Sequence, residues 1–115
     1  MKVLVTIWYE DVAPRFDLAS EVLMAQVDAS SGEIKEEKTL VLPSTSAEEL
    51  CRFILSEGVE LVVCGGIENE YYQFLVWKNV KVIDSIIGRY DKALELVATG
   101  DLEPGAILKE KEGVV

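Results

Sequence analysis

Hydrophobic and polar positions alternate with period two in the first part of the chain. Three stretches show this strand-like period: residues 3–8, 22–28 and 34–42. The first is apolar on both faces, which is typical of a central strand covered on both sides. The third carries a run of four charged residues, as an exposed sheet edge does. The pattern predicts a three-stranded meander, with residues 9–20 as an irregular connection.

Helical periods follow in the second part and alternate with short apolar runs. The sequence Ser46-Ala47-Glu48-Glu49 is a capping box, with Ser46 as N-cap and Glu49 reaching back to it, and predicts a helix start. Further helices are predicted over residues 69–78 and 90–99, and strands over residues 61–64 and 80–83. In this β-β-β-α-β-α-β-α order the later strands lie parallel to the first, with right-handed crossovers. We therefore expect an α/β fold with a mixed five-stranded sheet and helices on both faces.

Length and composition indicate one domain. The chain has 115 residues, of which 50% are hydrophobic, so it can form a core without metal or disulfide cross-links. We expect residues 1–102 to form this domain and residues 103–115 to be a solvated C-terminal tail. No apolar stretch approaches the roughly 20 residues of a membrane span, and the start lacks a signal-peptide cleavage site. A cytoplasmic protein without a membrane partner is the expectation.

The charge of the chain excludes several classes of function. With 21 acidic and 11 basic residues, the net charge is −10 at pH 7, and histidine is absent. A negative field repels phosphate backbones, so no nucleic-acid partner is expected. The lack of histidine removes the most common general base and metal ligand, and it excludes a Ser/His/Asp triad.

Ligands of open α/β sheets bind outside the carboxyl ends of the parallel strands. Here those ends lead into residues 8–15, 64–69 and 84–89, and we expect these three loops to meet. Gly65 and Gly66 would let the backbone approach a ligand, and the following helix start offers free N–H groups that favour an anion. The alternative is that the two glycines only form a tight turn.

Cys64 and Arg15 are the candidate side chains of this region. The helix dipole would favour the Cys64 thiolate, which could bind a soft metal or an iron–sulfur cluster; the alternative is a packed core thiol. Arg15 could bind an anion through two hydrogen bonds, or it could be a surface arginine paired with Asp11 or Asp17. Phe16 is expected to anchor this loop in the core.

Other charged residues are weaker candidates. Arg89 is a second arginine for an anion, and Asp84 ends a strand, where it is either an acid of a site or a turn cap. Further carboxylates of interest are Glu10, Asp11, Asp17, Asp28 and Glu68, of which Asp28 should lie at the opposite end of the sheet.

The helix predicted over residues 69–78 is apolar over more than one face. Tyr72 and Val76 lie to one side of its core stripe, and Trp77 lies to the other. Part of this helix is therefore expected to meet a partner or a second subunit of a homo-oligomer. The alternative is burial under the C-terminal tail.

Five segments carry a family resemblance: "VAPRFDLA", "VDASSGEI", "VELVVCGGI", "NVKVI" and "KALELVATGDL". Together with the order of elements over residues 1–102, they resemble the dinitrogenase iron–molybdenum cofactor-binding family of nitrogenase accessory and related small proteins. The turn formed by Gly65, Gly66 and Ile67 matches the family's usual glycine-glycine-isoleucine turn. In the first loop, Pro14, Arg15, Phe16 and Ala19 fit, whereas Asp17 and Leu18 stand where glycine and arginine are usual.

The resemblance implies a ribonuclease-H-like three-layer sandwich and a carrier rather than an enzyme. Such a nitrogen-fixation accessory protein binds an iron–molybdenum or related metal–sulfur cofactor and meets metallocofactor assembly proteins. The cofactor-binding residues implied are Arg15, Phe16, Cys64, Gly65, Gly66, Ile67 and Asn69, with Cys64 as the metal ligand. The missing arginine at Leu18 weakens the anion recognition that the family pattern implies.

Two other functions remain open at this stage. One is a protein-interaction module of the same fold without a metal ligand, and the other is a thiol-redox protein, which requires a low Cys64 pKa. A nuclease is not expected, because the first strand offers Thr6 and Trp8 where metal-binding carboxylates are needed.

Overall fold

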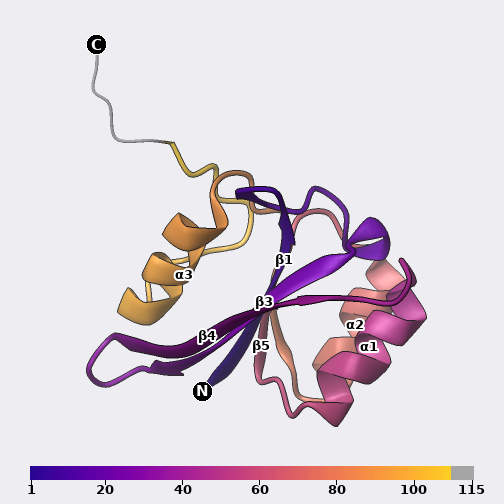
Figure 1. Ribbon diagram of the computed structural model, residues 1–115, viewed down its shortest axis with the longest axis horizontal. Coiled ribbons are helices and arrows are strands. Elements are labelled where there is room, and N and C mark those ends of the chain that lie inside the picture. The colour runs from indigo at the N-terminus through magenta and orange to yellow at the C-terminus, as the bar shows by residue number, and fades with distance from the viewer. Residues whose placement is uncertain (110–115) are drawn as a thin grey trace.

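The computed structural model describes residues 1–109 and places a mixed sheet between helices on its two faces (Figure 1). Helix α3 lies on one face, and α1 and α2 lie on the other, each side with its own hydrophobic cluster. The strands are β1 (Lys2–Trp8), β2 (Asp11–Val12), β3 (Glu21–Asp28), β4 (Glu33–Val41), β5 (Leu61–Val63) and β6 (Lys81–Ile83). The helices are α1 (Ala47–Ser56), α2 (Asn69–Trp77) and α3 (Tyr90–Thr99), with a short 3-10 turn, η1 (Phe16–Leu18).

The strand order is β4-β3-β1-β5-β6, with β2 paired to β1. Strands β1, β5 and β6 are parallel, and β3 runs antiparallel to both β1 and β4. The mixed α/β architecture is therefore confirmed. The expected strand number is wrong by one, because the connection predicted to be irregular contains β2, which makes the sheet six-stranded.

Strand β1 is central because both of its faces are covered. Val3, Val5 and Ile7 belong to the cluster under α3, whereas Leu4 belongs to the cluster under α1 and α2. Thr6 is fully buried on the same face as Leu4, and its Oγ1 has no hydrogen-bond partner within residues 1–109. The centre of the sheet therefore contains a buried polar atom that the packing does not satisfy.

The capping box at α1 forms in one direction. The Ser46 hydroxyl accepts a hydrogen bond from the Glu49 amide at 3.2 Å, as an N-cap does. The Glu49 carboxylate turns away and accepts from the Ser44 hydroxyl at 3.1 Å. The expected hydrogen bond from the Ser46 amide to the Glu49 side chain is thus replaced by the one from Ser44, which links the preceding loop to the helix.

Residues 103–109, predicted to be part of a solvated tail, are mostly exposed, but backbone hydrogen bonds tie them to the loop after β6. The Gly105 amide donates to the Asp84 carbonyl at 2.9 Å, and the Leu108 amide donates to the Ile87 carbonyl at 2.7 Å. The side chains of Ala106 and Leu108 pack against the cluster under α3. The packed chain therefore continues past residue 102, and residues 110–115 lie outside the part that the structure describes.

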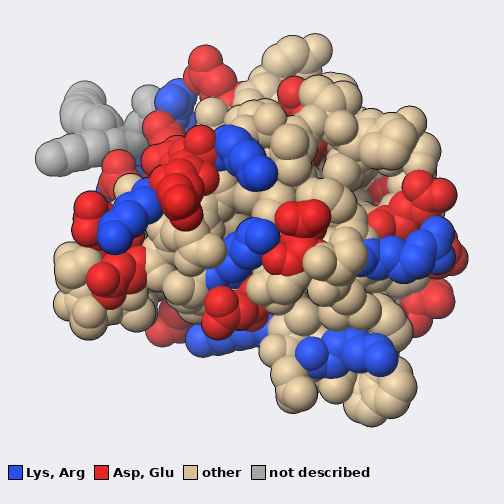
Figure 2. All heavy atoms as spheres, turned by 60° about the horizontal axis from the view of Figure 1, so that its bottom comes forward, with Lys and Arg blue, Asp and Glu red and all other residues tan. Residues whose placement is uncertain are grey.

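The surface carries the two signs of charge close together. Figure 2 shows acidic and basic side chains interspersed on one face rather than gathered into a positive area. Within residues 1–109, no helix has the length and apolar character needed to cross a membrane.

The backbone of Ala13 and Pro14 crosses directly over Gly65 at the end of β5. A Cβ added to Gly65 would overlap the carbonyl oxygens of both residues and lie 2.7 Å from the Pro14 carbonyl carbon. Two backbone hydrogen bonds hold the crossing: Gly66 donates to Pro14 at 2.7 Å, and Phe16 donates to Gly66 at 2.9 Å. From the sequence, Gly65 and Gly66 were expected to let a ligand approach the backbone. At Gly65 this space is taken by the backbone of Ala13 and Pro14.

We expect Thr6→Val to raise the free energy of unfolding by about 1 kcal/mol, because it replaces a buried unpaired hydroxyl with a methyl group of the same shape. Urea denaturation measures this change. The control is Thr39→Val on the exposed strand β4, which should change stability by less than about 0.5 kcal/mol. A loss of stability in Thr6→Val would show that the hydroxyl has a partner.

Gly65→Ala should lower the free energy of unfolding by about 2 kcal/mol or more, because its methyl group collides with backbone that has no room to move. Gly66→Ala is the matched control, since its nearest added contact, the Pro14 oxygen, would lie at an ordinary 3.5 Å. Thermal and urea unfolding of both variants give the comparison. Equal losses at the two positions would contradict the crossing.

Candidate functional site

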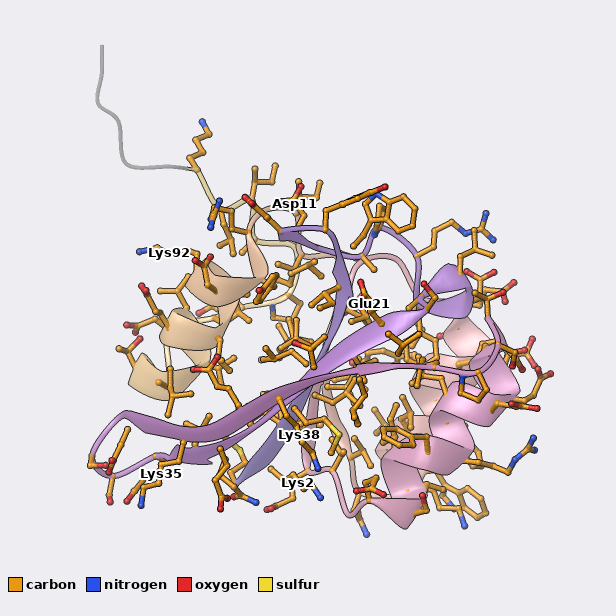
Figure 3. All side chains as sticks on the ribbon, in the orientation of Figure 1. Lys2, Asp11, Glu21, Lys35, Lys38 and Lys92 are labelled. Carbon is orange, nitrogen blue, oxygen red and sulfur yellow. The ribbon has the colours of Figure 1, made fainter. Side chains whose placement is uncertain are left out.

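Three loops meet at the carboxyl ends of β1, β5 and β6, as the sequence predicts. Arg15 forms a β-bridge with Gly66, and Asp11 forms one with Arg89. The Ser85 amide donates to the Gly65 carbonyl at 2.9 Å and joins the other two loops. We call this edge, residues 8–18, 64–70 and 84–91, the rim. Figure 3 shows Asp11 there, with Lys2 and Lys35 toward the opposite end of the sheet.

Arg15 reaches the surface but is paired. Its side chain is 61% exposed, and two of its nitrogens donate to the two Asp17 carboxylate oxygens at 3.1 and 2.7 Å. This pair raises the pKa of Arg15 and lowers the pKa of Asp17, with a smaller contribution from Glu68 to Arg15. The alternative of a surface arginine paired with Asp17 therefore describes the structure, and an anion at Arg15 must compete with this carboxylate.

The start of α2 supplies the backbone donors of the rim. The amides of residues 67–70 have no hydrogen-bond partner within the described chain, and Glu68, the N-cap, makes no side-chain cap. Asn69 is exposed, and Ile67 is partly exposed. The Gly66 amide, in contrast, is used by Pro14. The predicted donor at Ile67 is thus free for a ligand, whereas the one at Gly66 is not.

Cys64 is sealed inside the protein. Its side chain has 0% exposure and lies in the cluster under α1 and α2. Burial, with a smaller effect of the Asp84 charge, raises the pKa of the Cys64 thiol to about 12. Burial therefore opposes the thiolate that the helix dipole was expected to favour. The assignment of Cys64 as a metal ligand stays a prediction.

The seven cofactor-binding residues expected from the sequence divide into two groups. Four reach the surface to some extent: Arg15, Gly66, Ile67 and Asn69. Three are buried: Phe16, Cys64 and Gly65. Phe16 is 1% exposed, which confirms its predicted role as the anchor of the first loop. Cys64 and Arg15 therefore do not open onto a shared surface.

Arg89, Glu10 and Asp91 form a second group of ion pairs at the rim. The Arg89 guanidinium donates to Glu10 at 2.8 Å and to Asp91 at 3.1 Å, and these contacts raise the pKa of Arg89. Asp84 accepts from the Ser85 hydroxyl at 2.9 Å. Within residues 1–109, no group of three histidine, cysteine or carboxylate side chains is placed to hold a metal ion.

The sequence analysis placed residues 8–15 at this edge of the sheet, but it did not predict the hairpin at the end of β1. Strands β1 and β2 form a hairpin in which Trp8 pairs with Asp11, so Tyr9 and Glu10 make the turn. We call residues 8–11 the hairpin tip. The side chains of Trp8 and Tyr9 are 52% and 78% exposed and meet edge to face, with ring centroids 4.9 Å apart. This is the most exposed aromatic pair in contact within residues 1–109.

The outer side of α2 is also exposed. Trp77 is 72% exposed and Val76 is 44% exposed, whereas Tyr72 is partly buried. The Lys78 ammonium lies 4.6 Å from the centre of the Trp77 ring. Burial by the C-terminal segment does not occur within the described chain, because Ala106 packs on the opposite face of the sheet.

A second thiol lines a groove of about 300 Å³ between α1 and α2. Its walls include Cys51 and Tyr71, whose hydroxyl donates to Glu48 at 3.1 Å. Burial raises the pKa of Cys51 to about 11. Burial thus raises the pKa of both cysteines, the opposite of the low pKa that a thiol-redox protein requires.

Three solved structures with the same fold are similar to this chain. PH0822 superposes with a TM-score of 0.81 at 17% identity, covering 90% of this chain and 94% of its own. The protein mj0327 from Methanocaldococcus jannaschii superposes with a TM-score of 0.72 at 23% identity, covering 90% of this chain and 92% of its own. The apo form of the orange protein from Desulfovibrio gigas superposes with a TM-score of 0.70 at 18% identity, covering 91% of this chain and 92% of its own. At these identities the likeness shows the fold alone.

Sequence comparison shows more than the fold. No match is found among curated proteins. The family model described as dinitrogenase iron-molybdenum cofactor matches residues 1–100, which is most of the chain and includes all three loops of the rim. The protein therefore belongs to the dinitrogenase iron-molybdenum cofactor family.

Proposed function

We propose that this protein is a small non-catalytic carrier or accessory protein that binds an iron–molybdenum or related metal–sulfur cofactor at its rim. The observation that carries the proposal is the family match over residues 1–100. The three-layer arrangement is in keeping with the ribonuclease-H-like sandwich that such a carrier is expected to have. A cytoplasmic location and contact with metallocofactor assembly proteins are part of the same proposal.

The rim suits an anionic, sulfur-rich cluster through hydrogen bonds rather than through metal ligation. The amides at the start of α2 have no partner within residues 1–109, and the helix dipole adds positive potential there. Arg15 lies beside this turn, since it pairs with Gly66. Sulfide and oxo groups of a cluster accept hydrogen bonds from such donors. The cargo is then held at the surface and can be passed on.

Cys64 enters this proposal only as a reserve ligand beneath the surface. A thiol with 0% exposure and a pKa of about 12 does not bind metal in the conformation seen. Coordination by Cys64 would require an opening of the cluster under α1 and α2, in which it is buried. Loading of a Cys64→Ala variant therefore separates surface binding from ligation.

The test is anaerobic incubation with iron, sulfide and molybdate, followed by desalting, metal analysis and absorbance spectroscopy. Arg15→Ala should lower the metal retained per chain by about five-fold or more, because a charge-assisted hydrogen bond is lost. Asp17→Asn should raise retention, because it frees Arg15 from its partner. Cys64→Ala should retain metal as the unmodified protein does.

Arg52→Ala is the matched control, because Arg52 is an exposed arginine paired with Glu49 on α1 and belongs to none of the three loops of the rim. It should leave loading unchanged. Absence of retained metal in the unmodified protein would reject the carrier function. Equal losses in the Arg15 and Arg52 variants would reject the rim as the site, and loss in Cys64→Ala would replace surface binding by ligation.

A second candidate is a protein-interaction module that self-associates through α2. The exposed side chains of Val76 and Trp77, with Tyr72 beside them, favour a contact between copies of the chain. Lys78, placed over the Trp77 ring, leaves the outer edge of that ring free.

Sedimentation velocity over a range of protein concentrations tests this candidate. The unmodified chain should show a concentration-dependent dimer, and Trp77→Ala should shift it to monomer, because aromatic anchors dominate such contacts. Leu18→Ala removes another exposed apolar side chain, one that lies outside α2, and it should leave the dimer unchanged. A monomer at all concentrations would exclude the homo-oligomer.

A further inference from the structure

We propose that the hairpin tip, together with Ile87 and Ile107, forms a docking surface for a positively charged segment of another protein. The four apolar side chains concerned, Trp8, Tyr9, Ile87 and Ile107, are between 52% and 78% exposed. Large apolar side chains gathered at one edge of a small domain are typical of an interaction site. This proposal does not rest on cofactor binding.

The backbone pairing makes this surface continuous. Trp8 pairs with Asp11, and Asp11 pairs with Arg89. Two residues before Arg89, Ile87 pairs with Ile107. Four chain segments therefore lie side by side. At about 4.8 Å between neighbouring strands, they span about 15 Å, which is the width of an extended peptide with its side chains.

Tyr9 is held in a backbone conformation that does not suit it. Its φ is 56°, in the left-handed region, where glycine or asparagine is favoured in a two-residue hairpin turn. The tyrosine gains no burial in return, because its side chain is 78% exposed. A large aromatic side chain at this position therefore weakens the turn without adding to the core, which points to a role outside the fold.

The charge of the rim determines which partner fits. Its three loops carry seven carboxylates against two arginines, Arg15 and Arg89. The carboxylates are Glu10, Asp11, Asp17, Glu68, Glu70, Asp84 and Asp91. Both arginines already pair with carboxylates. Asp11 has no ion-pair partner within residues 1–109, and Figure 3 shows it at the end of the sheet remote from Lys2 and Lys35. The unbalanced charge beside the aromatic pair is therefore negative.

Exposed aromatic rings next to carboxylates bind cationic groups. The face of Trp or Tyr attracts a lysine or arginine side chain, and a neighbouring carboxylate adds to that attraction. Ile87 and Ile107 offer apolar contact a short distance away. The fitting partner is a segment in which lysine or arginine alternates with apolar residues. A second rim is a poor partner, because it would bring like charges together.

The test uses a synthetic twelve-residue peptide in which lysine alternates with valine, followed by isothermal titration and by amide shifts in ¹H–¹⁵N spectra. Tyr9→Gly and Asp11→Asn should each weaken binding by about five-fold, within the range expected for one cation–π or charged contact. Shifts should centre on residues 8–11 and 87–89. Tyr9→Gly suits its backbone angle, so the fold should survive the change.

Glu36→Gln and Glu37→Gln on β4 are the controls, because they remove the same charge from an exposed strand away from the rim. They should leave binding within about two-fold, since distant surface charges are screened. Equal weakening in the controls would overturn the proposal in favour of general charge attraction. So would equal binding of a lysine–serine peptide, or no binding at all. Self-association that Tyr9→Gly removes would assign the surface to a second copy of the chain instead.

Discussion

The crossing of residues 13–14 over Gly65 is the contact on which the rim depends. Hydrogen bonds with Gly66 and the buried ring of Phe16 hold this segment at the end of β5. Cys64, beside this crossing, is fully buried in the cluster under α1 and α2, and burial raises the pKa of its thiol. The same contact brings Arg15 to the start of α2. The crossing of residues 13–14 over Gly65 thus covers the end of β5 and places Arg15 on the rim.

A second crossing repeats this arrangement at the end of β6. A Cβ added to Gly88 would lie 2.7 Å from the Leu108 Cβ, and the φ of Gly88 is 135°, which a side chain rarely tolerates. Here the covering segment comes from the C-terminal part of the chain, held by the amide of Leu108. The ends of both later parallel strands are therefore covered by the protein itself. The rim is a built surface rather than an open crevice, so recognition must use its outward-facing amides, charges and aromatic rings.

The sequence predicted the elements well because their periods are local. The apolar run of β5 and the capping serine of α1 are visible in a few consecutive residues. The hairpin tip was missed because Tyr9 and Glu10 lack the glycine or asparagine that normally signals such a turn. The roles of Gly65 and Cys64 depend on a segment fifty residues away. A glycine that admits a ligand and one that admits another strand of the same chain have the same local sequence, so only the fold distinguishes them.

The two proposed surfaces share the first loop but should bind independently. Arg15 faces the start of α2, whereas the hairpin tip pairs with the segment before α3. Between them, the Val12 amide donates to Gly88 at 2.8 Å and the Ala13 amide donates to Thr6 at 2.9 Å, and both side chains are buried. A change at one surface reaches the other only through this fixed segment. Coupling between two sites requires an element that can adopt two arrangements. Residues 12–14 have a single arrangement, in which hydrogen bonds join them to the ends of three different strands. A cofactor and a protein partner can therefore occupy the rim together, which is the condition for handing a cargo to a bound recipient.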